Sequence, residues 1–274
     1  MTGAALPFIE AEVNYAGDIQ GRARFDVPDM SRTNMVLEPR TVRIHDARPL
    51  VGELSLDREG YVLVPHASTV SASRDMAELD RTYHQEVGEL IQALSGADRV
   101  LPQRTGLLLR YGERSEVQSW ARPARFAHLD YTASSAKDFV GWVEGWERQP
   151  PRPYGRFAIY QTWRAISDPP QDTPLAVCDG RSVADAETVT FDAVIGPETE
   201  PGQIFESRVV RPGPHHLWRY FPNMRADELL VFKAFDSADA RQLNVVHTAF
   251  DDPTAPADCV PRASLEARFF AFFD

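Results

Sequence analysis

The sequence of 274 residues predicts a mainly β fold with flanking helices, in which two sheets pack as a jelly roll. Two observations lead to this prediction. Many short runs are rich in β-branched and aromatic residues, and Pro, Gly, Asn and Asp separate them as turn residues do. Only two segments repeat apolar residues at steps of three and four, which is the spacing of an amphipathic helix.

The first part of the chain is expected to form short strands around one helix. Alternating apolar residues predict three strands, at residues 8–15, 41–45 and 61–65. Apolar side chains at three- and four-residue steps predict a helix at residues 73–94, and Ser95-Gly96 is a typical end for it. We expect this helix to pack on a sheet rather than to bind a partner.

The rest of the chain is expected to be β-rich, with one more helix at residues 134–148. Phe139, Trp142, Val143 and Trp146 would lie on one side of that helix, which is placed to cover a pocket as a lid. The remaining predicted strands cover residues 105–111, 157–166, 175–177, 205–210, 216–220, 229–235, 244–250 and 264–272.

Composition argues against several classes of function. A net charge of -11 disfavours a nucleic-acid partner, because phosphate binding depends on clustered Lys and Arg. The spacing of Cys178 and Cys259 suggests neither a disulfide framework nor a cysteine zinc site, so we expect a cytoplasmic protein. No apolar run approaches the length of a membrane span, and the N-terminus lacks a secretion signal. The sequence has no Gly-x-Gly pair, P-loop or Gly-x-Ser-x-Gly motif.

A possible metal site begins with His128 and Asp130. These residues are two positions apart, so on an extended strand their side chains leave the same face. A third ligand could come from His247, which lies in another β-rich run. Two His and one carboxylate on one face of a metal are typical of non-haem Fe(II) oxygenases. The adjacent His215 and His216 would point to opposite faces of a strand, so we do not expect them to share a metal.

A possible carboxylate-binding pair follows at Arg262 and Ser264, again two positions apart. The planar guanidinium can bind a carboxylate through two parallel hydrogen bonds. It could therefore hold the far end of a dicarboxylate co-substrate whose near end chelates the metal. The alternative is that Arg262 forms a surface ion pair with Glu266, which lies on the same strand face.

Several ordered blocks of the sequence together form a pattern that is more specific than any one motif. They are His128-Leu129-Asp130-Tyr131-Thr132, Thr162-Trp163-Arg164, Pro174-Leu175-Ala176-Val177-Cys178-Asp179 with Arg181-Ser182, His216-Leu217-Trp218, Tyr220-Phe221-Pro222-Asn223-Met224 with Asp227-Glu228, Phe232-Lys233-Ala234-Phe235-Asp236-Ser237, His247-Thr248-Ala249-Phe250 and Arg262-Ala263-Ser264-Leu265-Glu266. This pattern resembles one family, the 2-oxoglutarate- and Fe(II)-dependent hydroxylases and desaturases of secondary metabolism, which includes gibberellin desaturase-like proteins. Two departures from the family, Gln161-Thr162 before Trp163 and Arg219 in place of an aromatic residue, bear on the substrate.

The resemblance implies a double-stranded β-helix, a cupin-like jelly roll, in a single domain of residues 1–274. Residues 1–104 would elaborate a core formed by residues 105–274. It also implies Fe(II) as cofactor and 2-oxoglutarate as co-substrate. A small secondary-metabolite-type substrate would be hydroxylated or desaturated with O2, while 2-oxoglutarate is decarboxylated to succinate.

The resemblance also assigns roles to individual residues. His128, Asp130 and His247 would be the catalytic iron ligands. Arg262 and Ser264 would bind 2-oxoglutarate. Further residues in the resembling blocks would line the pocket, namely Trp163, Arg164, His216, Tyr220 and Lys233.

The residue pattern by itself also allows two other functions. A metal-dependent hydrolase could hold zinc with the same three ligands, although it would have no need of the Arg-x-Ser pair. A jelly-roll binding protein without catalysis is the second alternative, and an intact set of metal ligands argues against it.

Overall fold

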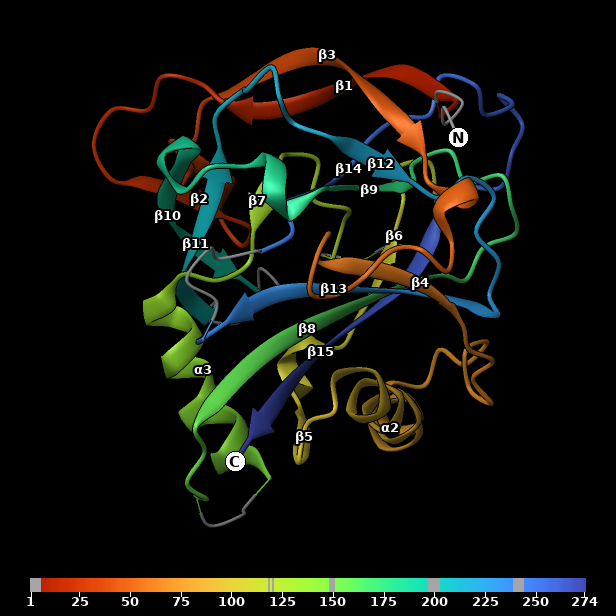
Figure 1. The fold of residues 1–274 in the computed structure, drawn as a ribbon. Coiled ribbons are helices and arrows are strands. Elements are labelled where there is room, and N and C mark those ends of the chain that lie inside the picture. Colours follow the sequence, from red (N-terminus) through yellow and green to blue (C-terminus); the bar gives the residue numbers. More distant parts are fainter. Residues whose placement is uncertain (1–5, 118, 120, 148–150, 197–202, 239–243) are drawn as a thin grey trace.

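Two β-sheets face each other in the computed structural model, and the longer helices pack against one of them (Figure 1). The structure describes residues 6–117, 119, 121–147, 151–196, 203–238 and 244–274. Within these residues one sheet has nine strands and the other has six. Neighbouring strands in each sheet come from distant parts of the chain, as in a jelly roll.

The nine-stranded sheet contains both short strands that carry the predicted metal ligands. In spatial order it consists of β1 (Phe8–Ala16), β3 (Leu37–Asp46), β12 (Trp218–Tyr220), β9 (Leu175–Cys178), β14 (His247–Ala249), β7 (His128–Leu129), β11 (Gln203–Val210), β10 (Thr188–Ile195) and β2 (Ala23–Asp26). The six-stranded sheet consists of β4 (Tyr61–Pro65), β13 (Glu228–Asp236), β8 (Arg156–Ala165), β15 (Ala263–Phe273) and β5 (Arg99–Pro102), with β6 (Leu108–Tyr111) also paired to β15.

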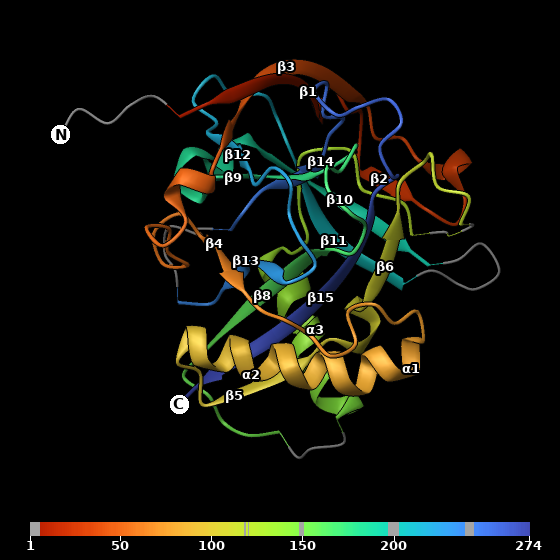
Figure 2. The same ribbon diagram turned by 90° about the vertical axis from the view of Figure 1, so that its right-hand side faces the viewer.

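The helices lie on opposite faces of the six-stranded sheet. The α-helices are α1 (Met76–Glu78), α2 (His84–Ser95) and α3 (Ala133–Trp146), and a π turn at Leu79–Tyr83 joins the first two. Figure 2 shows α2 along the outer face of β8 and β15, whereas α3 packs against their inner face. Short 3-10 turns occupy Met30–Arg32, Arg48–Leu50, Arg104–Gly106, Gly180–Ser182 and Asp185–Glu187.

Side chains along β15 point alternately to the two faces of the six-stranded sheet. Leu265, Ala267 and Phe269 point outward into the cluster that includes α2. Glu266 and Arg268 therefore point the other way, into the space between the sheets. A hydrogen bond from Arg268 to Asp130 joins this face to the residues that follow β7. The pleat thus directs Arg268 toward the predicted metal ligands, while Phe270 and Phe272 on the same face pack against α3.

The structure confirms the mainly β fold and most of the predicted strands. The first helix begins late, at Met76, because the side chain of Asp75 caps it, and it ends at Gly96, whose φ of 69° is left-handed. Thr132 and Ser135 form a capping box that starts α3, and Arg148, the predicted end of this helix, lies outside the described residues.

Three strands were not predicted, namely β2, β5 and β10. The first and second have only four residues each, too few for a period to show. In contrast, β10 alternates clearly enough to be found. None of the described helices is long and apolar enough to cross a bilayer.

Candidate metal centre

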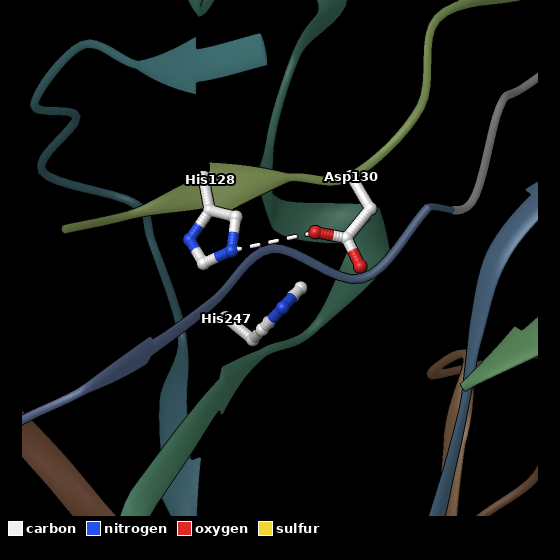
Figure 3. Close-up of side chains that lie close together, drawn as sticks. All are labelled: His128, Asp130 and His247. Atoms are coloured by element: carbon white, nitrogen blue, oxygen red, sulfur yellow. Dashed lines mark ion pairs between the residues drawn. The ribbon is translucent and has the colours of Figure 1, made fainter. Parts of the chain in front are cut away.

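The three predicted metal ligands lie together, as Figure 3 shows. Strand β14 pairs with β7 so that His247 is directly opposite His128. Their ring centroids are 4.3 Å apart. Asp130 follows β7, and its Oδ1 is 3.5 Å from His128 Nε2. One ligand atom from each residue falls within 4.8 Å of the other two, which is close enough to share a metal ion.

Backbone carbonyls orient both imidazole rings in the same way. Nδ1 of His128 is 2.8 Å from the carbonyl oxygen of Phe126, and Nδ1 of His247 is 3.2 Å from that of Val245. A carbonyl oxygen can only accept, so each Nδ1 carries a proton and Nε2 is the nitrogen left to face a metal. This is the arrangement that metal-binding histidines ordinarily have.

The electrostatics also suit a metal. Burial, together with the neighbouring His128, lowers the pKa of His247 to about 3, so the ring is neutral at physiological pH. Burial alone would raise the pKa of Asp130, but Arg268 and the two histidines hold it well below its ordinary value. Neutral imidazoles and an ionised carboxylate are the protonation states that bind a metal. The residues present therefore fit an iron ion.

Arg268 and Gln161 contact the second oxygen of Asp130. Nε and Nη2 of Arg268 donate to Oδ2 at 2.9 and 2.8 Å. The amide of Gln161 is satisfied when its nitrogen donates to the same Oδ2, at 2.5 Å, and its oxygen accepts from Arg268 Nη2, at 3.1 Å. Sequence reasoning did not assign either residue to the metal site. The signal was available, because Arg268 continues the alternation of Arg262, Ser264 and Glu266 on one face.

Arg262 and Ser264 lie side by side, as predicted for the carboxylate-binding pair. Nε and Nη2 of Arg262 donate to Ser264 Oγ at 3.3 and 3.1 Å, and Nη1 donates to the carbonyl of Thr173 at 3.0 Å. Glu266 is 3.6 Å away, so the alternative ion pair also exists, but it is buried rather than on the surface. Burial lowers the pKa of Arg262 to about 10, although Glu266 opposes the shift.

Aromatic side chains connect this pair to the metal ligands. The guanidinium carbon of Arg262 lies 5.1 Å from the ring centroid of Trp163. Trp163 belongs to the same buried cluster as Phe232, whose ring is 4.9 Å from that of His247. The indole nitrogen of Trp163 is buried and has no hydrogen-bond partner among the described residues. A buried hydrogen-bond donor without an acceptor lowers the stability of the fold, unless a bound ligand accepts the hydrogen bond.

A cavity of about 560 Å³ opens beside His128 and Asp130. This volume suits a drug-sized molecule. Arg262 and Ser264 are not among the described residues that line it. Much of the wall is apolar and comes from segments far apart in the sequence, including Phe25, Leu37, Leu108, Phe126, Phe191, Ala193 and Phe205. Polar side chains complete the wall, including Asn14, Gln103, Arg110, Arg122, Gln203, Ser207 and Arg268.

Two of the predicted pocket residues, Arg164 and Lys233, lie on the far side of the six-stranded sheet. Arg164 is adjacent to Trp163, so it points outward, where it donates to Tyr83 Oη at 3.2 Å. Nζ of Lys233 pairs with Asp57 at 3.1 Å and with Asp236 at 3.0 Å. These neighbours provide the partners that a buried ammonium needs, and neither residue lines the cavity.

His216 and Tyr220 also lie away from the cavity. The ring of His216 stacks on Tyr15, and Tyr220 packs against Phe250 in the core. The expectation that His215 and His216 could not share a metal was wrong, because they lie in a turn before β12 rather than on a strand. With Glu187 they form a second group of possible metal donors. Glu187 already accepts from the backbone nitrogen of Ala184, at 2.7 Å.

Known proteins resemble this chain along nearly its whole length. A family described as "Oxidoreductase/YMDC permease-like domain" matches residues 12–272. The Fe(II)/2-oxoglutarate-dependent dioxygenase nvfI of Aspergillus novofumigatus is 30% identical over 253 residues, which are 89% of this chain and 87% of that protein. The hydroxylase/desaturase CTB9 of Cercospora beticola is 30% identical over 256 residues, which are 86% of this chain and 78% of that protein.

A solved structure has the same fold. It is described as "iron and alpha-ketoglutarate-dependent endoperoxidase NvfI with different conformation". The two chains superpose with a TM-score of 0.79 at 25% identity, over 97% of this chain and 98% of the other.

Proposed function

This chain belongs to the family of Fe(II)/2-oxoglutarate-dependent hydroxylases and desaturases of secondary metabolism, and we propose that His128, Asp130 and His247 are its iron ligands. The enzyme uses Fe(II), 2-oxoglutarate and O2 to oxidise a small molecule. The observation that carries the ligand assignment is the matched pair of backbone hydrogen bonds. Each fixes one imidazole with Nε2 available, beside an ionised Asp130.

Bound Fe(II) and 2-oxoglutarate supply an oxidant from O2 that removes hydrogen from a substrate carbon, with release of succinate and CO2. His128, Asp130 and His247 would hold the ion, and a set of only three protein ligands would leave room for the co-substrate and O2. The outcome is hydroxylation when oxygen is transferred to that carbon, or desaturation when a second hydrogen is lost.

Arg262, Ser264 and Trp163 form the binding site for the distal carboxylate of 2-oxoglutarate in this proposal. A buried guanidinium gains most from an anionic partner when it is removed from water, and burial already weakens its hold on its proton. The indole nitrogen of Trp163 offers one more buried donor nearby. Three donors of this kind suit a carboxylate, which can accept several hydrogen bonds.

The cavity beside His128 and Asp130 holds the oxidisable substrate in our proposal. Its phenylalanines come from strands of the nine-stranded sheet and the loop before β7. An apolar wall excludes water from the oxidised carbon, and polar side chains such as Asn14, Gln203 and Ser207 orient the substrate. The N-terminal 104 residues contribute Phe25 and Leu37 to this wall and strands to both sheets. We therefore propose that residues 1–274 act as one catalytic domain.

Turnover of the co-substrate tests this function against a hydrolase or a non-catalytic binding protein. Purified protein with Fe(II) and 2-oxoglutarate should form succinate only when O2 is present. Replacement of Fe(II) by Zn(II) should abolish succinate formation. Protein that hydrolyses esters or amides with Zn(II), and never consumes 2-oxoglutarate, would contradict the proposal. A panel of apolar small molecules that fit a cavity of about 560 Å³ can then be screened for stimulation of turnover.

A further inference from the structure

We propose that Arg268, assisted by Gln161, makes Asp130 a monodentate metal ligand by occupying Oδ2 and leaving only Oδ1 for the ion. Arg268 is in this view a positioning residue, since it acts on the metal through Asp130. The inference rests on the assignment of His128, Asp130 and His247 as iron ligands.

The two oxygens of Asp130 have different surroundings. Oδ2 accepts from Nε and Nη2 of Arg268, at 2.9 and 2.8 Å, and from the amide of Gln161 at 2.5 Å. Oδ1 faces His128 Nε2, at 3.5 Å. Since the oxygen of Gln161 also accepts from Arg268, the three side chains form a closed ring of hydrogen bonds around Oδ2. Rotation of the carboxylate toward the metal would break this ring.

Binding of Asp130 through one oxygen matters because it sets how many coordination positions on the iron stay open. Octahedral iron held by three protein atoms keeps three positions free, of which a keto acid chelates two and O2 needs the third. A carboxylate can also bind a metal through both oxygens. If Asp130 did so, it would occupy the position that O2 needs while still allowing 2-oxoglutarate to chelate. Holding Oδ2 away from the ion keeps that position open.

The surroundings of Arg268 fix its direction. It is buried on the inner face of β15, and its Nη1 donates to the carbonyl of Gly106 at 3.1 Å. A Cβ on Gly106 would come within 3.2 Å of the Arg268 side chain, so the loop closes tightly over it. Glu266 lies 3.9 Å from Nη2 on the same strand face. These contacts leave the guanidinium fork directed at Asp130.

Arg110 provides a matched control. It also lines the cavity and pairs with Glu266, at 2.9 Å, and it is mostly buried. Its Nη1 donates to the carbonyl of Arg122 at 2.7 Å, and within the described part of the chain none of its hydrogen bonds or ion pairs reaches Asp130. Replacing it therefore removes a buried cation from the same network without releasing Oδ2.

Nitric oxide binding under anaerobic conditions tests the proposal, because NO occupies the position that O2 would take. Wild type, Arg268→Gln, Arg268→Lys and Arg110→Gln are loaded with Fe(II) and 2-oxoglutarate and titrated with NO, followed by electron paramagnetic resonance. We expect Arg268→Gln to retain Fe(II) and the 2-oxoglutarate chelate but to bind NO about 10- to 100-fold more weakly, the scale on which residues behind a metal ligand act. Arg268→Lys should recover part of the loss, and Arg110→Gln should match wild type.

Other outcomes separate the possibilities. Wild-type NO affinity in Arg268→Gln, or an equal loss in Arg110→Gln, would overturn the positioning role and leave Arg268 as a neutralising charge. Wild-type protein that binds no Fe(II) would refute the ligand assignment itself, whatever the Arg268 variants do. If Arg268→Gln does not fold, Arg268→Lys carries the test, because it keeps the positive charge but removes the planar fork that holds Oδ2. A folded Arg268→Lys protein with wild-type NO affinity would contradict the proposal.

Discussion

His247 lies directly opposite His128 in the antiparallel pair of β14 and β7, and each ring is held by the carbonyl of the residue two positions before it. The same backbone geometry therefore sets both imidazoles. Asp130, two positions after His128, completes a group of ligand atoms within 4.8 Å of one another.

Loss of any one ligand should remove iron. We expect His128→Ala, Asp130→Ala and His247→Ala to purify folded but to hold less than about a tenth of the wild-type iron after dialysis, because two remaining ligands bind weakly. His216→Ala is the control, since the side chain of His216 is also buried but lies against Tyr15. Metal analysis that finds stoichiometric iron in all three ligand variants would rule out the assignment.

Removing the guanidinium of Arg262 should weaken 2-oxoglutarate binding. Breaking a buried charge pair costs about 3–5 kcal/mol, so Arg262→Ala should raise the dissociation constant by roughly two to four decades. Arg262→Lys should recover only part of this, because an ammonium lacks the planar fork. Fe(II) affinity should stay near wild type. Isothermal titration of iron-loaded variants measures both, and unchanged 2-oxoglutarate affinity in Arg262→Ala would place the carboxylate elsewhere.

Trp163→Phe should separate ligand binding from folding. The indole nitrogen has no partner among the described residues, so removing it should leave the midpoint of thermal unfolding unchanged or slightly higher. If this donor binds the 2-oxoglutarate carboxylate, affinity should fall by about 10- to 100-fold, since a hydrogen bond to a charged group contributes about 1.5–3 kcal/mol. A variant with lower stability and normal affinity would mean that Trp163 only packs between the sheets.

Stability of the metal-free protein should fall in acid. The folded pKa of His247 is lowered to about 3, below that of an exposed histidine, so the unfolded chain binds the extra proton first. The resulting stabilisation is complete above pH of about 6.5 and is lost as pH falls toward 3, by up to about 1.4 kcal/mol per pH unit. Urea unfolding of wild type and His247→Gln at several pH values measures this. Equal slopes in the two proteins would show that His247 does not contribute.

The sequence alone could predict the contacts that local periodicity determines. His128 with Asp130, and Arg262 with Ser264, share a strand face because each pair is two positions apart. By the same alternation, the adjacent residues Trp163 and Arg164 face opposite ways. Trp163 points between the sheets, and Arg164 points outward. Membership of a resembling block did not reveal this difference in direction.

Contacts between residues far apart in the sequence could not be predicted from local periodicity. Arg268 meets Asp130 across 138 positions, because the faces of two different sheets meet there. Phe25 and Phe191 both line the cavity because β2 pairs in parallel with β10. His215 and His216 share Glu187 because a turn, rather than a strand, holds them. Nothing in the local spacing of these residues specifies such partners.

The most direct test of the metal centre is anaerobic titration of 2-oxoglutarate into protein loaded with Fe(II). We predict a weak visible charge-transfer band that saturates at one equivalent of 2-oxoglutarate in wild type and is absent from Asp130→Ala and His247→Ala. A wild-type protein that binds Fe(II) but never develops the band, or an Asp130→Ala protein that develops it fully, would contradict an iron centre built from His128, Asp130 and His247.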